Sequence, residues 1–180
     1  MTVAANNWQP LGSLGLTVDA PTMGTLEFPP FDMLMVQYSI MGYNISDTTG
    51  MIFNYDTSAV SNNYGDRHLW VGVGVTTLSN SQTTSATIVR LGGFNSPRAQ
   101  CGSVYIAARG SISSQVVMTI LHNSGSGSAA AVTNCELPAA GSWGGTGGVP
   151  EDVYAIEMKT VSGNNILAGS GFAVFGCNGL

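Results

Sequence analysis

The sequence predicts an all-β domain, either a sandwich or a barrel. Short segments rich in Val, Ile, Tyr, Phe and Thr recur along the chain, and segments of Gly, Asn and Ser separate them. No segment repeats apolar residues at helical spacing over about twelve residues. The sequence has no internal repeat of the kind that indicates a propeller or a solenoid. About nine strands at this spacing are typical of a sandwich or a barrel.

Residues 1–30 differ from the rest of the chain. They are rich in proline, contain no Lys or Arg, and end in Phe28-Pro29-Pro30-Phe31, a step that favours extended backbone. Their scattered apolar residues without a regular period are Trp8, Leu11, Leu14 and Leu16. We therefore expect an extended N-terminal arm, or an edge strand, in residues 1–30. A β-sandwich domain follows in residues 31–180.

The predicted strands begin after residue 32. They cover residues 33–43, 50–55, 67–75, 86–91, 103–109, 115–121, 129–134, 152–161 and 171–176. In residues 153–161 the side chains alternate between polar and apolar, which indicates a strand with one buried face. Tyr154, Ile156 and Met158 would face the core, and the opposite face would carry Val153, Ala155, Glu157 and Lys159.

The composition excludes two classes of partner. Charged residues make up 8% of the chain, the net charge is −5, and Lys159 is the single lysine. Binding to nucleic acid or to an anionic membrane needs clustered cations, so we expect neither partner. A surface built from Ser, Thr, Asn and Gly has little like-charge repulsion, which is typical of oligomers and large assemblies.

The N-terminal residues lack the basic and apolar regions of a secretory signal, and no segment is apolar for long enough to span a membrane. We expect synthesis in the cytoplasm without a signal peptide. Three widely spaced cysteines, Cys101, Cys135 and Cys177, then predict reduced, buried thiols instead of disulfides.

Residues 50–70 hold the densest group of charged and titratable side chains. His68 and His122 have no histidine or cysteine at the short spacing that metal sites favour. Asp56 and Asp66 flank a loop rich in Asn and Ser, but the alternating acids of a calcium-binding loop are missing. We therefore expect no metal, no cofactor and no catalytic residue. The loop aromatics Tyr64 and Trp143 would instead contact a partner subunit or a glycan.

Three stretches resemble motifs of small structural proteins from tailed bacteriophages. The first is GMIFNYDTSAVSNNYGDRHL, where a strand ends in an aromatic-Asn pair and an Asp, and a loop with Asn-Tyr and Arg follows. The matching residues are Phe53, Asn54, Asp56, Asn63, Tyr64 and Arg67. The second is TTSATIVRLGG, and the third is the closing segment 168–176. Tyr55 departs from the pattern, which has a glycine there.

The resemblance implies a jelly-roll-like antiparallel sandwich that serves as a capsid cement or decoration protein. Such a protein is often a homotrimer, lies on the outside of the virion and bridges neighbouring subunits of the major capsid protein. Asn54, Asp56, Asn63, Tyr64 and Arg67 would order a corner between two strands, and the N-terminal arm would contact the shell. The alternative is a receptor- or glycan-binding module on a tail or a fibre. An enzyme such as a glycan hydrolase is the third possibility, without a pair of carboxylates to nominate.

Overall fold

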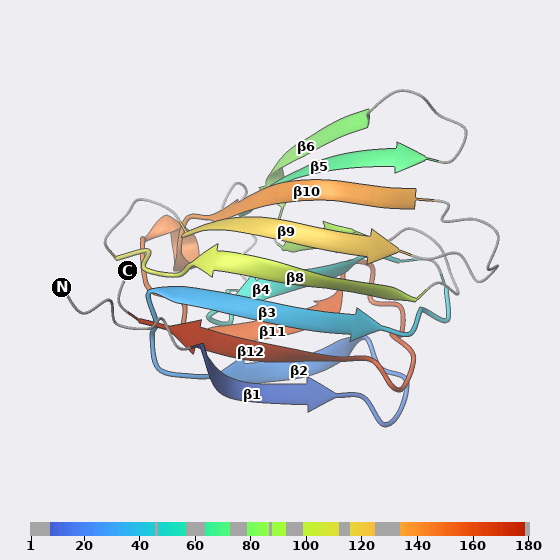
Figure 1. Ribbon diagram of the computed structural model, residues 1–180, viewed down its shortest axis with the longest axis horizontal. Coiled ribbons are helices and arrows are strands. Elements are labelled where there is room, and N and C mark those ends of the chain that lie inside the picture. Colours follow the sequence, from blue (N-terminus) through green and yellow to red (C-terminus); the bar gives the residue numbers. More distant parts are fainter. Residues whose placement is uncertain are drawn as a thin grey trace.

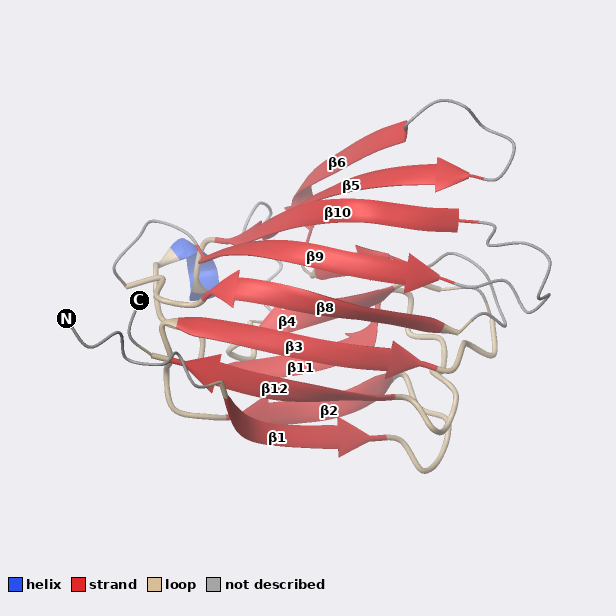
Figure 2. Cartoon of the chain, in the orientation of Figure 1, coloured by secondary structure: helices blue, strands red, loops and turns tan. Residues whose placement is uncertain are grey.

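The computed structural model describes residues 8–45, 47–56, 64–72, 79–86, 88–92, 99–111, 116–124 and 134–178. Strands dominate this part of the chain, and a single short 3-10 turn, η1 (Thr146–Gly148), interrupts them (Figure 2). The strands are β1 (Gln9–Gly15), β2 (Thr22–Glu27), β3 (Met33–Ile40), β4 (Thr49–Phe53), β5 (Tyr64–Gly72), β6 (Ser79–Ala86), β7 (Val89–Gly92), β8 (Gln100–Ala107), β9 (Val116–Ser124), β10 (Asn134–Trp143), β11 (Ala155–Thr160) and β12 (Gly171–Cys177).

The strands form two antiparallel sheets, and the prediction of an all-β sandwich is confirmed. One sheet has the order β1-β12-β3-β8-β9-β10-β5-β6, and the other has the order β2-β11-β4-β7. Strands pair in a nested way, β1 with β12, β2 with β11, β3 with β8 and β4 with β7. Successive pairs alternate between the two sheets, which is the winding of an eight-stranded jelly roll.

Two hairpins are inserted into this jelly roll. The strands β5 and β6 lie between β4 and β7 in the chain, and β9 and β10 lie between β8 and β11. All four join the edge of the first sheet beside β8 and widen it to eight strands, as Figure 1 shows. The first sheet therefore extends beyond the four-stranded sheet that packs behind it.

The core lies between the sheets. Side chains alternate between the two faces of a strand, and those on the inner face form the core. In β3, Leu34, Val36, Tyr38 and Ile40 point inward and are buried, while the residues between them face outward. β12 alternates in a similar way, and the period-two pattern of the sequence reflects this arrangement.

The predicted alternation around β11 is partly wrong. Ile156 and Met158 are buried as expected, but 39% of Tyr154 is exposed. Val153 and Ala155, which were expected on the outer face, are buried. Tyr154 precedes the strand, and its backbone N–H donates to the side chain of Asn54.

Of the two expectations for residues 1–30, the edge strand is confirmed for the described residues, and an arm apart from the sandwich is wrong. β1 pairs with β12 at the edge of the first sheet, and β2 pairs with β11 at the edge of the second. Leu11, Leu14 and Leu16 are partly buried and pack against the core. Apolar spacing is irregular here because β1 contains a register shift between Pro10 and Gly12.

Two further strands lie largely outside the predicted strand segments. The predicted strand at 129–134 lies outside the described residues except for Asn134. β6 consists almost entirely of Ser, Thr, Asn and Gln, which an edge strand tolerates because one of its sides has no neighbouring strand. β10 contains Pro138, and its pairing with β5 shifts register between Leu137 and Ala140. A bulge of this kind accommodates the missing N–H of a proline.

Candidate functional site

The residues of the phage-like motif form a buried corner where the jelly roll meets the inserted hairpins. Phe53 ends β4, Tyr64 begins β5 and Trp143 ends β10. The ring centroids of Phe53 and Trp143 are 5.3 Å apart, and those of Tyr64 and Trp143 are 6.3 Å apart. All three side chains are buried. We call them, together with Asn54 and Asp56, the aromatic corner.

Asn54 ties the corner to the segment that enters β11. Its side-chain oxygen accepts hydrogen bonds from the N–H groups of Tyr154 and Ala155, at 2.9 and 3.1 Å. Its side-chain nitrogen donates to the carbonyl of Asp152 at 2.8 Å. One amide therefore satisfies three backbone groups at and before the start of β11, and buried polar groups require such partners.

Two polar contacts complete the corner. The indole N–H of Trp143 donates to the carboxylate of Asp56 at 3.0 Å, and both side chains are buried. The backbone N–H of Phe53 donates to the hydroxyl of Tyr64 at 3.1 Å. Burial raises the pKa of the Tyr64 phenol above its ordinary value, although the hydrogen bond from Phe53 opposes the shift. The phenol is therefore neutral, and its role in the corner is to accept a hydrogen bond.

A tight turn carries the chain out of β4. Asn54 and Tyr55 both have positive φ, 49° and 59°, and the N–H of Asp56 donates to the carbonyl of Phe53 at 2.8 Å. These values are typical of a type I′ turn, in which Asn suits the first central position and Gly the second. Tyr55 takes the left-handed conformation without being glycine, and its hydroxyl hydrogen-bonds the carboxylate of Glu27. The turn thus forms despite the departure at Tyr55.

The structure brings Asn54, Asp56 and Tyr64 together, but it does not do so for every predicted corner residue. Arg67 lies within β5, and its backbone pairs with Ala140 and Gln82. Asn63 lies outside the described residues.

The prediction that Tyr64 and Trp143 are exposed loop aromatics is wrong. Trp143 has no exposed surface and Tyr64 has 1%, because both rings pack on Phe53 between the sheets. Neither can contact a glycan or a partner subunit in this fold. A Trp between glycines looks like a loop residue in the sequence, and the strand pairing that buries it joins segments far apart in the chain.

A charged cluster that the sequence pattern did not reveal lies at one end of the sandwich. The guanidinium of Arg109 contacts Asp32 at 2.9 Å and Asp152 at 2.8 Å. Desolvation favours a higher pKa for Asp152, but hydrogen bonds from Ser111 and Arg109 outweigh it, and the pKa is lowered. The cluster joins the segments before β3, after β8 and before β11. The sequence pattern did not reveal this cluster because no two of the three charged residues are neighbours in the chain.

A second buried polar group lies near the start of β4. The hydroxyl of Tyr43 contacts the hydroxyl of Thr49 at 2.6 Å and donates to the side-chain oxygen of Gln100 at 3.1 Å. Burial raises the pKa of Tyr43, as it does for Tyr64. Nearby, the buried carboxylate of Asp47 accepts hydrogen bonds from the N–H groups of Ser162 and Asn164. These contacts hold loops and strands to one another.

The thiols differ from the expectation of buried cysteines. Cys177 is buried, but Cys101 is exposed on β8, so the expectation is wrong for Cys101.

Within the described ranges, no three His, Cys, Asp or Glu side chains are grouped to hold a metal ion. No helix in this part of the chain is long and apolar enough to cross a membrane. No protein-family model and no curated protein matches the sequence.

Proposed function

We propose that this chain is a structural protein of a bacteriophage virion, of the cement or decoration type, that binds the outside of the capsid shell. The observation that carries the proposal is the architectural use of the phage-like motif. Asn54, Asp56 and Tyr64 are buried and hydrogen-bonded to backbone or to Trp143, so their polar groups hold the fold together. The jelly roll, which recurs in viral capsid domains, supports the same proposal.

The mechanism would be non-covalent. A cement protein bridges neighbouring subunits of the major capsid protein and resists their separation. Joining several copies in one rigid oligomer raises the affinity for the shell by effective concentration, by about 10²–10⁴ over a single footprint. Because β1 and β2 belong to the sheets, the shell contact would be made by the surface of the sandwich and its loops.

The test is the number of copies of this chain in particles purified from its source. Quantitative mass spectrometry gives the ratio of this chain to the major shell protein. A ratio approaching one supports a cement protein spread over the capsid. Complete absence from the particles would overturn the proposal.

A receptor- or glycan-binding module on a tail or a fibre is the second candidate. The jelly roll favours it as well, because lectin domains use the same fold. A few copies per particle, together with binding of the isolated protein to a glycan array, would support this alternative. The contact residues would have to differ from Trp143 and Tyr64, which are buried.

A further inference from the structure

The side chain of Tyr55 lies across the outer side of the second sheet. Tyr55 follows β4, Glu27 ends β2, and β11 lies between these two strands (Figure 1). The hydroxyl of Tyr55 nevertheless donates to the carboxylate of Glu27, and both residues are exposed. The ring therefore crosses β11 beside Ala155, which pairs with Glu27 and has no exposed surface.

The ring of Tyr55 is held at both of its ends. At the phenol end, the carboxylate of Glu27 fixes the hydroxyl. At the backbone end, Tyr55 follows Asn54, whose buried side chain binds the N–H groups of Tyr154 and Ala155. Of Tyr55, 49% is exposed, as expected for a ring with one face toward the sheet and the other open to solvent. A ring fixed in this way loses little conformational freedom when a ligand packs on it.

A second exposed tyrosine, Tyr154, lies next to this ring. Its backbone N–H donates to the side chain of Asn54, so one buried amide positions both tyrosines. The pKa of the Tyr55 phenol is raised, chiefly by its hydrogen bond with Glu27, and the nearby phenol of Tyr154 adds to the shift. The two phenols and the carboxylate are therefore close enough to contact one ligand. We call Tyr55, Tyr154 and Glu27 the tyrosine platform.

Tyr55 occupies a position that favours glycine. Its φ of 59° is left-handed, where a residue with a Cβ atom is strained, and the second central position of a type I′ turn prefers Gly. Strained residues persist where the surrounding structure holds them, and they cluster at positions that bind ligands. The strain and the exposure of the same side chain together point to a binding role.

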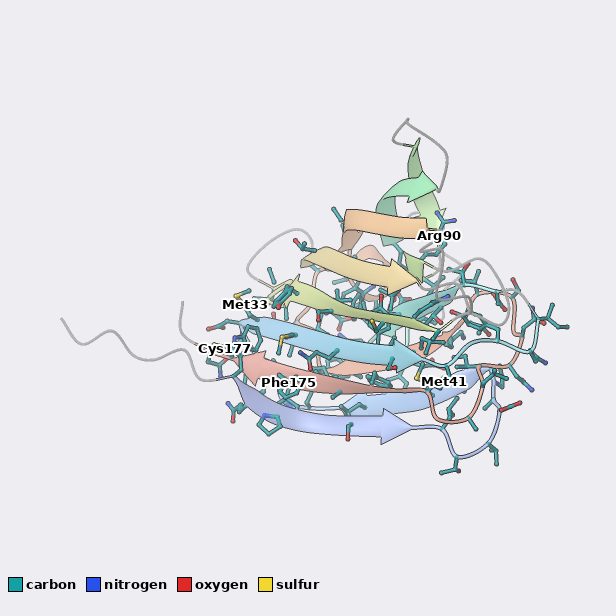
Figure 3. The ribbon with its side chains drawn as sticks, turned by 45° about the vertical axis from the view of Figure 1, so that its right-hand side comes forward. Met33, Met41, Arg90, Phe175 and Cys177 are labelled. Carbon is teal, nitrogen blue, oxygen red and sulfur yellow. The ribbon has the colours of Figure 1, made fainter. Side chains whose placement is uncertain are left out.

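Among the described residues, one other tyrosine is strongly exposed, and its surroundings differ. Tyr105 is 37% exposed on the first sheet, but the ring of Trp8 packs edge-on against it, with the two centroids 6.4 Å apart. Met33 and Phe175 lie near one another at the same end of this sheet, as Figure 3 shows, and both are half-buried. Tyr105 therefore serves as a comparison for the tyrosine platform.

We propose that the tyrosine platform binds a neutral carbohydrate. The face of a sugar ring that carries C–H groups packs on an exposed aromatic face, and tyrosine offers such a face together with a polar tip. The sugar hydroxyls donate to the carboxylate of Glu27, whose two oxygens can accept more than the one hydrogen bond from Tyr55. A phosphate or an acidic sugar is disfavoured, because like charges brought together at a binding surface repel one another.

This inference rests on the second candidate function, glycan binding, and names the site that would carry it. A platform of three side chains binds a short sugar weakly. Several copies on one particle would strengthen attachment to a surface that displays many sugars, through effective concentration.

The experiment is binding of the full chain to an array of neutral oligosaccharides of glucose, galactose, mannose and N-acetylglucosamine. Titration calorimetry then measures the affinity for the oligosaccharides that bind. Tyr55→Gly removes the ring and relieves the strain, so a loss of affinity in this variant cannot be attributed to unfolding. We expect Tyr55→Gly and Tyr154→Ala each to weaken binding by about tenfold or more.

Tyr105→Ala is the matched control, because it removes an exposed tyrosine ring from the other sheet, and it should leave the affinity unchanged. Glu27→Gln keeps the shape of the side chain and removes its charge. It should weaken binding of neutral sugars and reduce the discrimination against acidic ones. Circular dichroism verifies that each variant is folded.

The outcomes separate the site from the function. Sugar binding that Tyr55→Gly and Tyr154→Ala leave unchanged would overturn the tyrosine platform and leave glycan binding standing. A wild-type protein that binds none of the neutral oligosaccharides would overturn both. Binding of choline without any sugar would mean that the aromatic faces recognise a cation, and it would also overturn the proposal. None of these outcomes bears on the cement proposal, which is tested on particles.

Discussion

Trp143 donates its indole N–H to the carboxylate of Asp56 across 3.0 Å, and this contact joins residues 87 positions apart in the chain. Trp143 ends β10 in the inserted part of the first sheet, while Asp56 follows β4 of the second sheet. A buried hydrogen bond to a carboxylate contributes more than one between neutral groups. The contact therefore connects the inserted hairpins to the jelly roll.

Replacing Trp143 by Phe should destabilise the protein markedly. The variant loses a hydrogen bond to a charged acceptor and leaves space in the packing against Phe53, so we expect a loss of about 2–4 kcal/mol in the free energy of unfolding. Urea denaturation followed by circular dichroism measures it. The control is Trp8→Phe, which changes a half-buried Trp on the sheet surface and should cost about 1 kcal/mol or less. Equal losses in the two variants would contradict a special role for the corner.

Replacing Tyr55 by Gly should stabilise the protein. Tyr55 occupies the left-handed region with φ of 59°, where side chains other than Gly and Asn are strained. An Asn-Gly pair is the preferred centre of a type I′ turn, so we expect a gain of about 0.5–1 kcal/mol despite the lost contact with Glu27. The measurement is the midpoint of urea unfolding. Tyr55→Phe removes only the hydroxyl and serves as the control. A Gly variant less stable than the wild type but more stable than the Phe variant would show that the Tyr55–Glu27 contact outweighs the strain.

Local pattern in the sequence predicts some parts of this structure and not others, for a physical reason. The alternation in residues 33–40 is enough to separate the buried face of β3 from its exposed face, because side chains alternate along any strand. The partners of Asn54 lie about one hundred residues away along the chain, and which segments meet depends on the winding of the jelly roll. Trp143 shows the consequence, since its glycine-rich neighbours indicate a loop while its strand partners bury it.

Deleting residues 1–30 should prevent the chain from folding. The deletion removes β1 and β2, exposes the edges of β12 and β11, and takes Met23 and Phe28 out of the core. Unpaired edges and exposed apolar surface favour aggregation. We expect an insoluble product, or a soluble one without a cooperative melting transition in circular dichroism. Deletion of residues 1–7 leaves every described strand in place and is the control. A truncated protein that melts cooperatively would show that the remaining strands form an independent domain.

Stability should fall in acid partly because of Asp152. Its pKa in the folded protein is lowered below the ordinary 3.8, so folding favours the carboxylate form. The stabilisation by the contact with Arg109 is present above about pH 4 and is lost as the pH falls through the lowered pKa. Asp152→Asn should therefore be less stable than the wild type at neutral pH, by up to about 1 kcal/mol for a partly exposed pair. The two proteins should converge in stability below about pH 3.

Thermal melts of both proteins between about pH 2.5 and pH 7 measure this difference. The same substitution in an Arg109→Gln background is the control, because the pH dependence of the difference should shrink when the guanidinium is absent. Salt at about 0.5 M should weaken the effect too, since both partners are partly exposed. A difference that stays constant across this pH range would mean that Asp152 acts through the uncharged geometry of its hydrogen bonds to Ser111, and the ion pair would then contribute nothing measurable to stability.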